Sequence, residues 1–250
     1  MLKKNIFYQK PFRLLFSFLL VWFVLFEFVL VANGILPKPS SVYNSIKDIW
    51  GIYSFLPNIL YSFGAITFGL VFSVLLIYFF RKVLLNKNIF TELIFAVNKL
   101  KHFIPVVILS AFIIFWFNNS VYIEYIFILI IGFIYLSGEM MLYSDRTKSE
   151  YILAAKSLKI IDKKINGEIK FKQLLPMLEE SFLKLHFILW SVLITFEFIQ
   201  HQWGFGKIIF DSLKYKDMPT LFVVALIIYL LISSGYFIIK FLFNRYVHWE

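Results

Sequence analysis

The sequence contains no cysteine and few charged residues. Without cysteine, the chain can form no disulfide bond, thiolate metal site or cysteine nucleophile. Charged residues make up 16% of the 250, against about 25% in ordinary soluble domains, so a soluble domain of this length would lack the polar side chains to cover its surface. Only 10 residues are glycine, and no stretch has the form GxxxxGK[ST]. We therefore expect no ATP site on this chain.

What fills the sequence instead is long apolar runs. The hydrophobic set makes up 60% of the residues, 32 of them Phe, and the mean hydropathy is +0.80. One helical crossing of a ~30 Å hydrocarbon core takes ~20 residues. The pattern predicts an all-α polytopic membrane protein with about six transmembrane helices in a single domain, residues 1–250. The predicted crossings are 12 to 33, 58 to 80, 102 to 118, 121 to 143, 183 to 201 and 220 to 243.

The basic residues are distributed unevenly between the two sides of these crossings. Twenty of the 25 Lys and Arg lie in segments on the same side as the N-terminus, and five lie on the other. Because cytoplasmic loops are enriched in Lys and Arg, this split predicts a multi-pass membrane protein with both termini in the cytoplasm. The formal charge of +10 is thus a topology signal, and we expect lipid rather than nucleic acid as its partner.

Two loops are longer than a simple bundle needs. In the outer loop, Val42, Ile46, Ile49 and Trp50 have helical spacing and predict a short surface helix. The cytoplasmic loop, residues 144–184, is the longest polar segment.

The cytoplasmic loop has the pattern of a helix, a turn and a second helix. Asn166-Gly167 predicts the turn, and Leu175-Pro176 leads into the fifth crossing. The residues that share one face of the first helix are Tyr151, Ala154, Ala155, Leu158 and Ile161.

This loop resembles the cytoplasmic loop of ABC-importer permeases, in which a Glu-Ala-Ala start, a Gly and a later Pro form the coupling helix that seats in the ATPase. An ordered set of further motifs resembles the nitrate, sulfonate and taurine permease group. The matching stretches are Phe26-Glu27, Leu36-Pro37-Lys38-Pro39-Ser40-Ser41-Val42, Glu197, Gly204-Phe205-Gly206-Lys207 and Arg245-Tyr246-Val247-His248-Trp249.

The loop departs from the family pattern at two positions. Leu153 replaces the family's Glu, and Lys159 replaces its Gly. Because Gly permits a tight turn, we expect the helix with Lys159 to continue toward Asn166-Gly167. Either the ATPase is matched to this loop, or coupling is altered.

The resemblance implies a permease subunit that forms half of a substrate pathway and works as a homodimer. A separate ATPase would supply ATP hydrolysis, and an extracytoplasmic binding protein would deliver the substrate. The subunit itself would be no enzyme and need no cofactor. No metal is expected either, since the four histidines are scattered over different segments. The residues assigned to ATPase coupling are Tyr151, Ala154, Ala155, Leu158, Lys159, Leu175 and Pro176.

Acidic residues inside the crossings are the remaining candidates. Charged groups at such depth are costly and need partners or water. Glu27 and Glu197, with Gly204 and Gly206, are candidates for an outer gate or pathway, and Glu139 is a candidate for an inner gate. The alternative for Glu27 and Glu197 is a fixed hydrogen bond with a structural purpose, and for Glu139 an interfacial position.

Two rival functions remain open. The chain could be a transport-inactive scaffold or sensor that has kept the permease fold. It could also be an ion-driven secondary transporter that uses Glu27, Glu139 and Glu197 as carrier sites.

Overall fold

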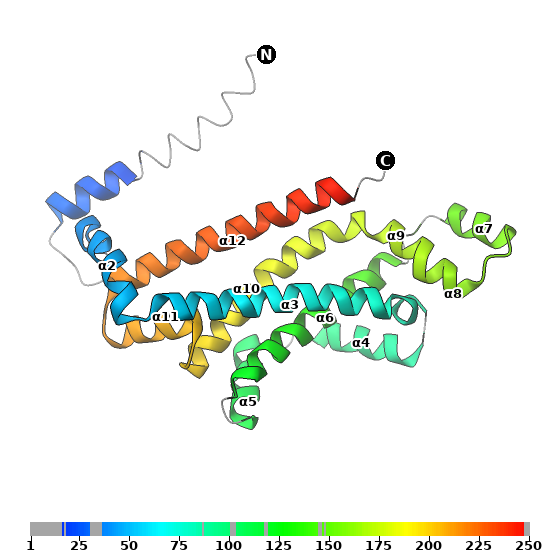
Figure 1. The fold of residues 1–250 in the computed structure, drawn as a ribbon, viewed down its shortest axis with the longest axis horizontal. Helices are drawn as coiled ribbons and strands as arrows, with labels where there is room; N and C mark the ends of the chain where they lie inside the picture. The colour runs from blue at the N-terminus through cyan, green and yellow to red at the C-terminus, as the bar shows by residue number, and fades with distance from the viewer. Residues whose placement is uncertain are drawn as a thin grey trace, which may run out of the picture. The chain divides into compact units, whose positions relative to one another are not determined.

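A computed structural model describes residues 17, 19–30, 37–86, 88–100, 104–117, 120–144, 147 and 149–247. Every regular element within these residues is a helix (Figure 1). The elements in chain order are η1 (Leu25–Val29), α2 (Pro39–Ile52), α3 (Phe55–Leu84), α4 (Ile89–Leu100), α5 (Val106–Trp116), α6 (Val121–Ser144), α7 (Ser149–Ser157), α8 (Asp162–Lys164), η2 (Ile165–Lys170), α9 (Phe171–Leu174), η3 (Pro176–Leu178), α10 (Glu179–Gln200), α11 (Gly204–Lys214) and α12 (Met218–Tyr246).

Four of these helical segments are long and apolar enough to cross a membrane. They are Phe55–Leu84, Tyr122–Ser144, Pro176–Gln200 and Met218–Tyr246. The all-helical membrane character predicted from the sequence is therefore confirmed, but the count of six is not reached within the described residues.

Two predicted crossings appear as shorter apolar helices. Within the described residues, the run 102 to 118 contributes the helix Val106–Trp116, about 16 Å at 1.5 Å per residue. This helix begins after Pro105 and is capped by Phe117. In the run 12 to 33, the described apolar helix is Leu19–Val29, and the rest lies partly outside the described residues.

The chain divides into two compact units, which are described separately. The first comprises Met1–Pro57 with Ile208–Ile228, and the second comprises Asn58–Lys207 with Tyr229–Glu250.

In the first unit, α2 is the short helix predicted for the outer loop. Val42 and Ile49 are buried, whereas Ile46 and Trp50 are about half exposed. Tyr53, at the C-terminal end of α2, donates a hydrogen bond from its hydroxyl to Asp217 Oδ2 at 2.8 Å. These contacts join α2 to the residue that precedes α12.

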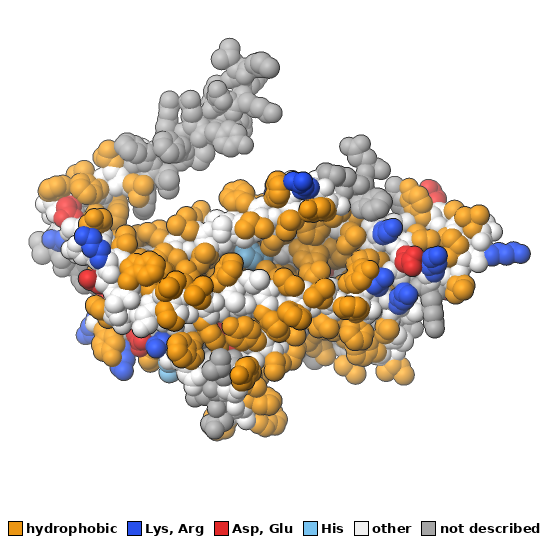
Figure 2. Space-filling model, in the orientation of Figure 1, with side chains coloured by type: hydrophobic (Ala, Val, Ile, Leu, Met, Phe, Trp, Pro, Cys, Tyr) orange, Lys and Arg blue, Asp and Glu red, His pale blue; other side chains and the backbone are white. Residues whose placement is uncertain are grey.

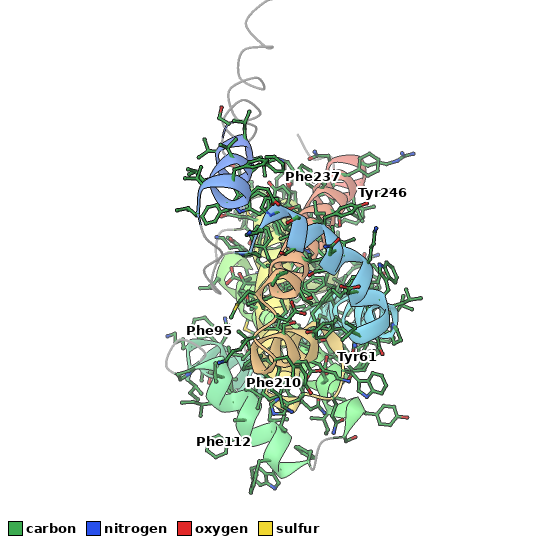
Figure 3. All side chains as sticks on the ribbon, turned by 90° about the vertical axis from the view of Figure 1, so that its left-hand side faces the viewer. Tyr61, Phe95, Phe112, Phe210, Phe237 and Tyr246 are labelled. Carbon is green, nitrogen blue, oxygen red and sulfur yellow. The ribbon has the colours of Figure 1, made fainter. Side chains whose placement is uncertain are left out.

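In the second unit, α10 is the central helix. Leu185, Leu189, Leu193 and Phe196 have no exposed surface, and their spacing of three or four residues places them along one face. The neighbours of α10 are chiefly α6 and α5, and α4 packs against α6. Phe112 on α5 and Tyr246 on α12 point away from neighbouring helices (Figure 3), and both are mostly exposed.

The cytoplasmic hairpin of the sequence prediction forms one end of the second unit (Figure 1). The helix expected to continue past Lys159 ends at Ser157, so that prediction is wrong. Lys159 itself has a left-handed backbone, with φ of 57°. Its N–H donates to Lys156 O at 2.9 Å, and the Ile160 N–H donates to Ala155 O at 3.1 Å. This pair of bonds is the Schellman motif that commonly ends helices at Gly.

The expected turn at Asn166-Gly167 is also wrong, because both residues lie within the π-helical segment η2. Arg81 Nε donates to the Gly167 carbonyl oxygen at 2.8 Å. A Cβ at Gly167 would lie 2.5 Å from Lys82 Cγ. A side chain here would displace that of Lys82, because the end of α3 approaches the hairpin closely.

Candidate functional site

The hydrogen bonds of Glu197 place it at the centre of a polar cluster in the second unit. Glu197 lies near the C-terminal end of α10 and has no exposed surface. Ser62 on α3 donates its hydroxyl hydrogen to Glu197 Oε1 at 2.5 Å. The Gly206 N–H, in the first turn of α11, donates to Glu197 Oε2 at 2.8 Å. The carboxyl group therefore joins three helices.

The start of α11 is shaped to meet this carboxyl group. Gly204 has φ of 87°, a conformation that L side chains rarely adopt, and its N–H donates to Asn58 Oδ1 at 2.8 Å. At Gly206, a Cβ would lie 2.3 Å from the Phe198 backbone nitrogen. The Phe205 N–H donates to Ser62 Oγ at 3.0 Å. Three consecutive amides at a helix N-terminus thus face oxygen acceptors, an arrangement that favours negative charge.

A second buried carboxyl group belongs to this cluster. Glu124, in the first turn of α6, has no exposed surface. Tyr61 donates its hydroxyl hydrogen to Glu124 Oε2 at 3.0 Å, and Figure 3 marks Tyr61 on α3. Tyr61 and Ser62 are consecutive residues on α3, and each donates to one of the two carboxyl groups, so Glu124 and Glu197 lie close together where α6 packs against α10. Glu124 Oε1 is buried without a hydrogen-bond donor.

No basic side chain offsets these two carboxyl groups among the described residues. The ion pair within that part of the chain is Lys184–Glu180, at 2.7 Å on the surface of α10. The described residues also contain no group of three or more His, Cys, Asp or Glu able to hold a metal ion. The cluster is therefore acidic and lacks a countercharge from the described side chains.

The structure thus brings together Glu197, Gly204 and Gly206, which the sequence analysis placed at one gate. It adds Asn58, Tyr61, Ser62 and Glu124, which that analysis missed. One signal for Glu124 was present: it is a charged residue four positions into an apolar run. For Asn58 and Ser62, the signal was their spacing of four residues, which places both on one face of a helix.

The other two acidic candidates have separate partners. Glu27 belongs to the first unit, where its Oε2 accepts a hydrogen bond from the Ser40 N–H at 3.1 Å. Ser40 lies in the first turn of α2, whose amides have no partner within the helix. Glu139 Oε2 accepts a hydrogen bond from the Ser181 hydroxyl at 3.2 Å, near the start of α10. The bond of Glu27 is of the fixed kind considered as its structural alternative, and the gate assignments of Glu27 and Glu139 stay predictions.

The residues assigned to coupling are displayed on and after α7. Tyr151 is 55% exposed and Leu158 is 74% exposed, whereas Ala155 is buried. Ile161, after the left-handed turn, is 75% exposed. Leu175 and Pro176 are half-buried at the junction between α9 and η3. Figure 2 shows Lys and Arg side chains gathered over this end of the second unit, among exposed apolar ones.

A cavity of about 520 Å³ lies at the base of this hairpin. Its lining combines the end of α3, α4, the end of α6 and η2, and Asn166 Nδ2 donates to Asn86 Oδ1 at 2.5 Å in its wall.

Comparison with known proteins gives no relative of this chain. No protein-family model, curated protein or solved structure matches the chain.

Proposed function

We propose that the chain is the permease subunit of an ATP-driven ABC importer. The observation that supports this most directly is α7, a short helix with exposed apolar and basic side chains between two membrane-length helices. Its end at Ser157 is followed by a left-handed residue, Lys159, at the position where the resembling family has Gly. The geometry of the family's turn is thus present although the glycine is not.

The surface of α7 has the chemistry of a docking element. Tyr151, Leu153 and Leu158 are each more than half exposed, and Lys156 and Lys159 lie beside them. Exposed apolar side chains gathered on a short polar loop are characteristic of protein–protein contact. We assign α7 and the following turn to contact with a cytoplasmic ATP-binding cassette ATPase.

In the proposed assembly, two copies of the chain each supply half of the pathway. A closed two-fold pair is the commonest arrangement of identical subunits. Each copy would cross the bacterial inner membrane six times, with both termini in the cytoplasm. An extracytoplasmic binding protein would deliver the substrate. Closure of the ATPases would move the two halves between inward-open and outward-open states through the hairpin.

Photo-crosslinking in living cells tests the proposal. A photoreactive phenylalanine analogue at Leu158 is expected to cross-link to an ATP-binding cassette ATPase, identified by mass spectrometry. The same analogue at Phe112, which is 67% exposed on α5, serves as the control and should not capture the ATPase. Cross-linking at Leu158 to lipid, or to proteins of other classes alone, would contradict the proposal.

Transport measurements separate the two rival functions. The complex isolated with its ATPase, in proteoliposomes, should hydrolyse ATP faster when substrate-loaded binding protein is present. A scaffold would give no such stimulation. Uptake that persists without ATP and collapses with an ionophore would instead favour an ion-driven transporter.

A further inference from the structure

The acidic cluster contains a buried oxygen atom that its surroundings do not satisfy. Glu124 Oε1 has no donor, although a buried acceptor without a donor costs about 1–3 kcal/mol and more when charged. A polar group of matching chemistry is close by, because the Glu197 carboxyl group is bonded to Ser62, the residue after the Tyr61 that is bonded to Glu124. Two ionised carboxylates would repel each other there, and each would also lose its hydration.

We propose that Glu124 and Glu197 form a proton-binding site, in which Glu124 Oε1 carries the proton and donates it to the Glu197 carboxylate. The proton reduces two buried negative charges to one. It also converts the unsatisfied oxygen into a hydrogen-bond donor. This inference goes beyond the proposed permease function and holds whether or not α7 contacts an ATPase.

The other hydrogen bonds decide which carboxyl group is protonated. Glu197 already accepts from the Ser62 hydroxyl and from the Gly206 amide, and both donors favour the ionised form. Glu124 accepts one described hydrogen bond, from Tyr61. The carboxylate with more donors therefore keeps the charge, and the other keeps the proton.

The same bonds make a metal cation a poorer occupant. Hard cations such as Ca²⁺ take six to eight oxygen ligands. Here the Ser62 hydroxyl is engaged with Glu197 and with the Phe205 amide, and Glu124 Oε1 alone among the four carboxylate oxygens lacks a described donor. A single available oxygen, Glu124 Oε1, is too few ligands for such a cation but is sufficient to bind a proton.

Other titratable groups around the pair are tyrosines. Tyr61 on α3 and Tyr125 on α6 both interact electrostatically with Glu124 and Glu197. Tyr125 donates its hydroxyl hydrogen to the Tyr61 carbonyl oxygen at 3.4 Å. The described residues of α5 include no ionisable side chain. The first turn of α11 contains one, Lys207, whose ammonium group lies over the Trp203 ring. The proton would thus link Glu124 on α6 to Glu197 on α10, and no described basic side chain forms an ion pair with either carboxyl group.

Infrared spectroscopy of the purified full-length protein tests the site. At neutral pH the wild-type protein should show a protonated-carboxyl C=O band that shifts in D₂O. Glu124→Gln should abolish this band, because its amide can donate to Glu197 without a proton being taken up. Glu92→Gln, which alters an exposed carboxylate on α4, should leave the band unchanged.

Two results would overturn the inference. One is a wild-type protein without the band at neutral pH, which is informative even where the variant fails to fold. The other is a thermal midpoint of the wild-type protein that rises with NaCl but not with KCl, and loses that response in Glu124→Gln. This second result would assign the site to Na⁺.

Discussion

Gly204 and Gly206 show how single residues determine the candidate site. Gly204 is needed for its positive φ, whereas Gly206 is needed because α11 approaches the end of α10 too closely for a side chain. Both allow backbone amides to reach oxygen acceptors on neighbouring helices.

Replacing Gly206 with alanine should therefore destabilise the protein. The added Cβ would lie 2.3 Å from the Phe198 nitrogen and 2.5 Å from Glu197 Cβ. Overpacking of this kind costs about 1–3 kcal/mol, measured as a lower thermal midpoint in detergent. Gly51→Ala is the matched control, since nothing lies within 4 Å of its added Cβ. Equal midpoints for the two variants would contradict the close approach at α11.

At the scale of elements, the ends of helices decide the geometry of the hairpin and of α2. The C-terminus of α7 uses the Schellman bonds at Lys159 and Ile160, although Lys adopts a left-handed backbone less readily than Gly. The ends of α2 depend on side chains from other segments, Glu27 at the start and Asp217 at the end.

Lys159→Gly should stabilise the hairpin without changing its fold. A left-handed conformation costs an ordinary L residue about 1–2 kcal/mol and costs Gly little, so we expect a gain of about 1 kcal/mol. Lys156→Gly, inside α7, should instead lose about 1 kcal/mol. Hydrogen exchange of the α7 amides measures both effects. Faster exchange in Lys159→Gly would show that the residue is not left-handed.

Because of the hydrogen bond between Tyr53 and Asp217, the stability of the folded protein should decrease as the pH becomes alkaline. Burial, followed by the hydrogen bond to Asp217, raises the pKa of Tyr53 from 10.0 to about 12. Because the folded-state pKa is the higher one, the bond stabilises fully below pH ~10 and is lost as the pH rises toward 12.

Thermal midpoints of the wild type and Tyr53→Phe measure this effect. The difference between them should be largest below pH ~10 and shrink above it. Tyr43→Phe, at a side chain that is 61% exposed, should show no such trend. A difference that stays constant up to pH 12 would argue against the bond.

At the scale of the whole molecule, the distribution of charge predicts the orientation in the membrane. Lys156 belongs to the basic hairpin, which we place in the cytoplasm, and Lys216 belongs to a segment with few basic residues.

Single-cysteine labelling tests this orientation, because the natural chain has no cysteine to remove. In intact spheroplasts, a membrane-impermeant maleimide should label Lys216→Cys and should label Lys156→Cys only after permeabilisation. The reverse pattern would invert the topology and place α7 out of reach of a cytoplasmic ATPase.

Several features of this protein follow from the sequence alone. Composition and apolar runs were sufficient for the helical membrane character, because the hydrocarbon core requires long apolar helices. The presence of α2 and the grouping of Glu197 with Gly204 and Gly206 also follow, because the residues of each are close in the chain.

The tertiary structure decided the rest. Glu124 and Ser62 join Glu197 from helices more than 60 residues away in sequence, and helix packing sets that meeting, which no local pattern encodes. Residue preference argued against a left-handed turn at Lys159, but the hydrogen bonds of the Lys159 and Ile160 amides form one. Local sequence thus determined which segments are helices, whereas contacts between distant segments determined where those helices end and which buried carboxyl groups meet.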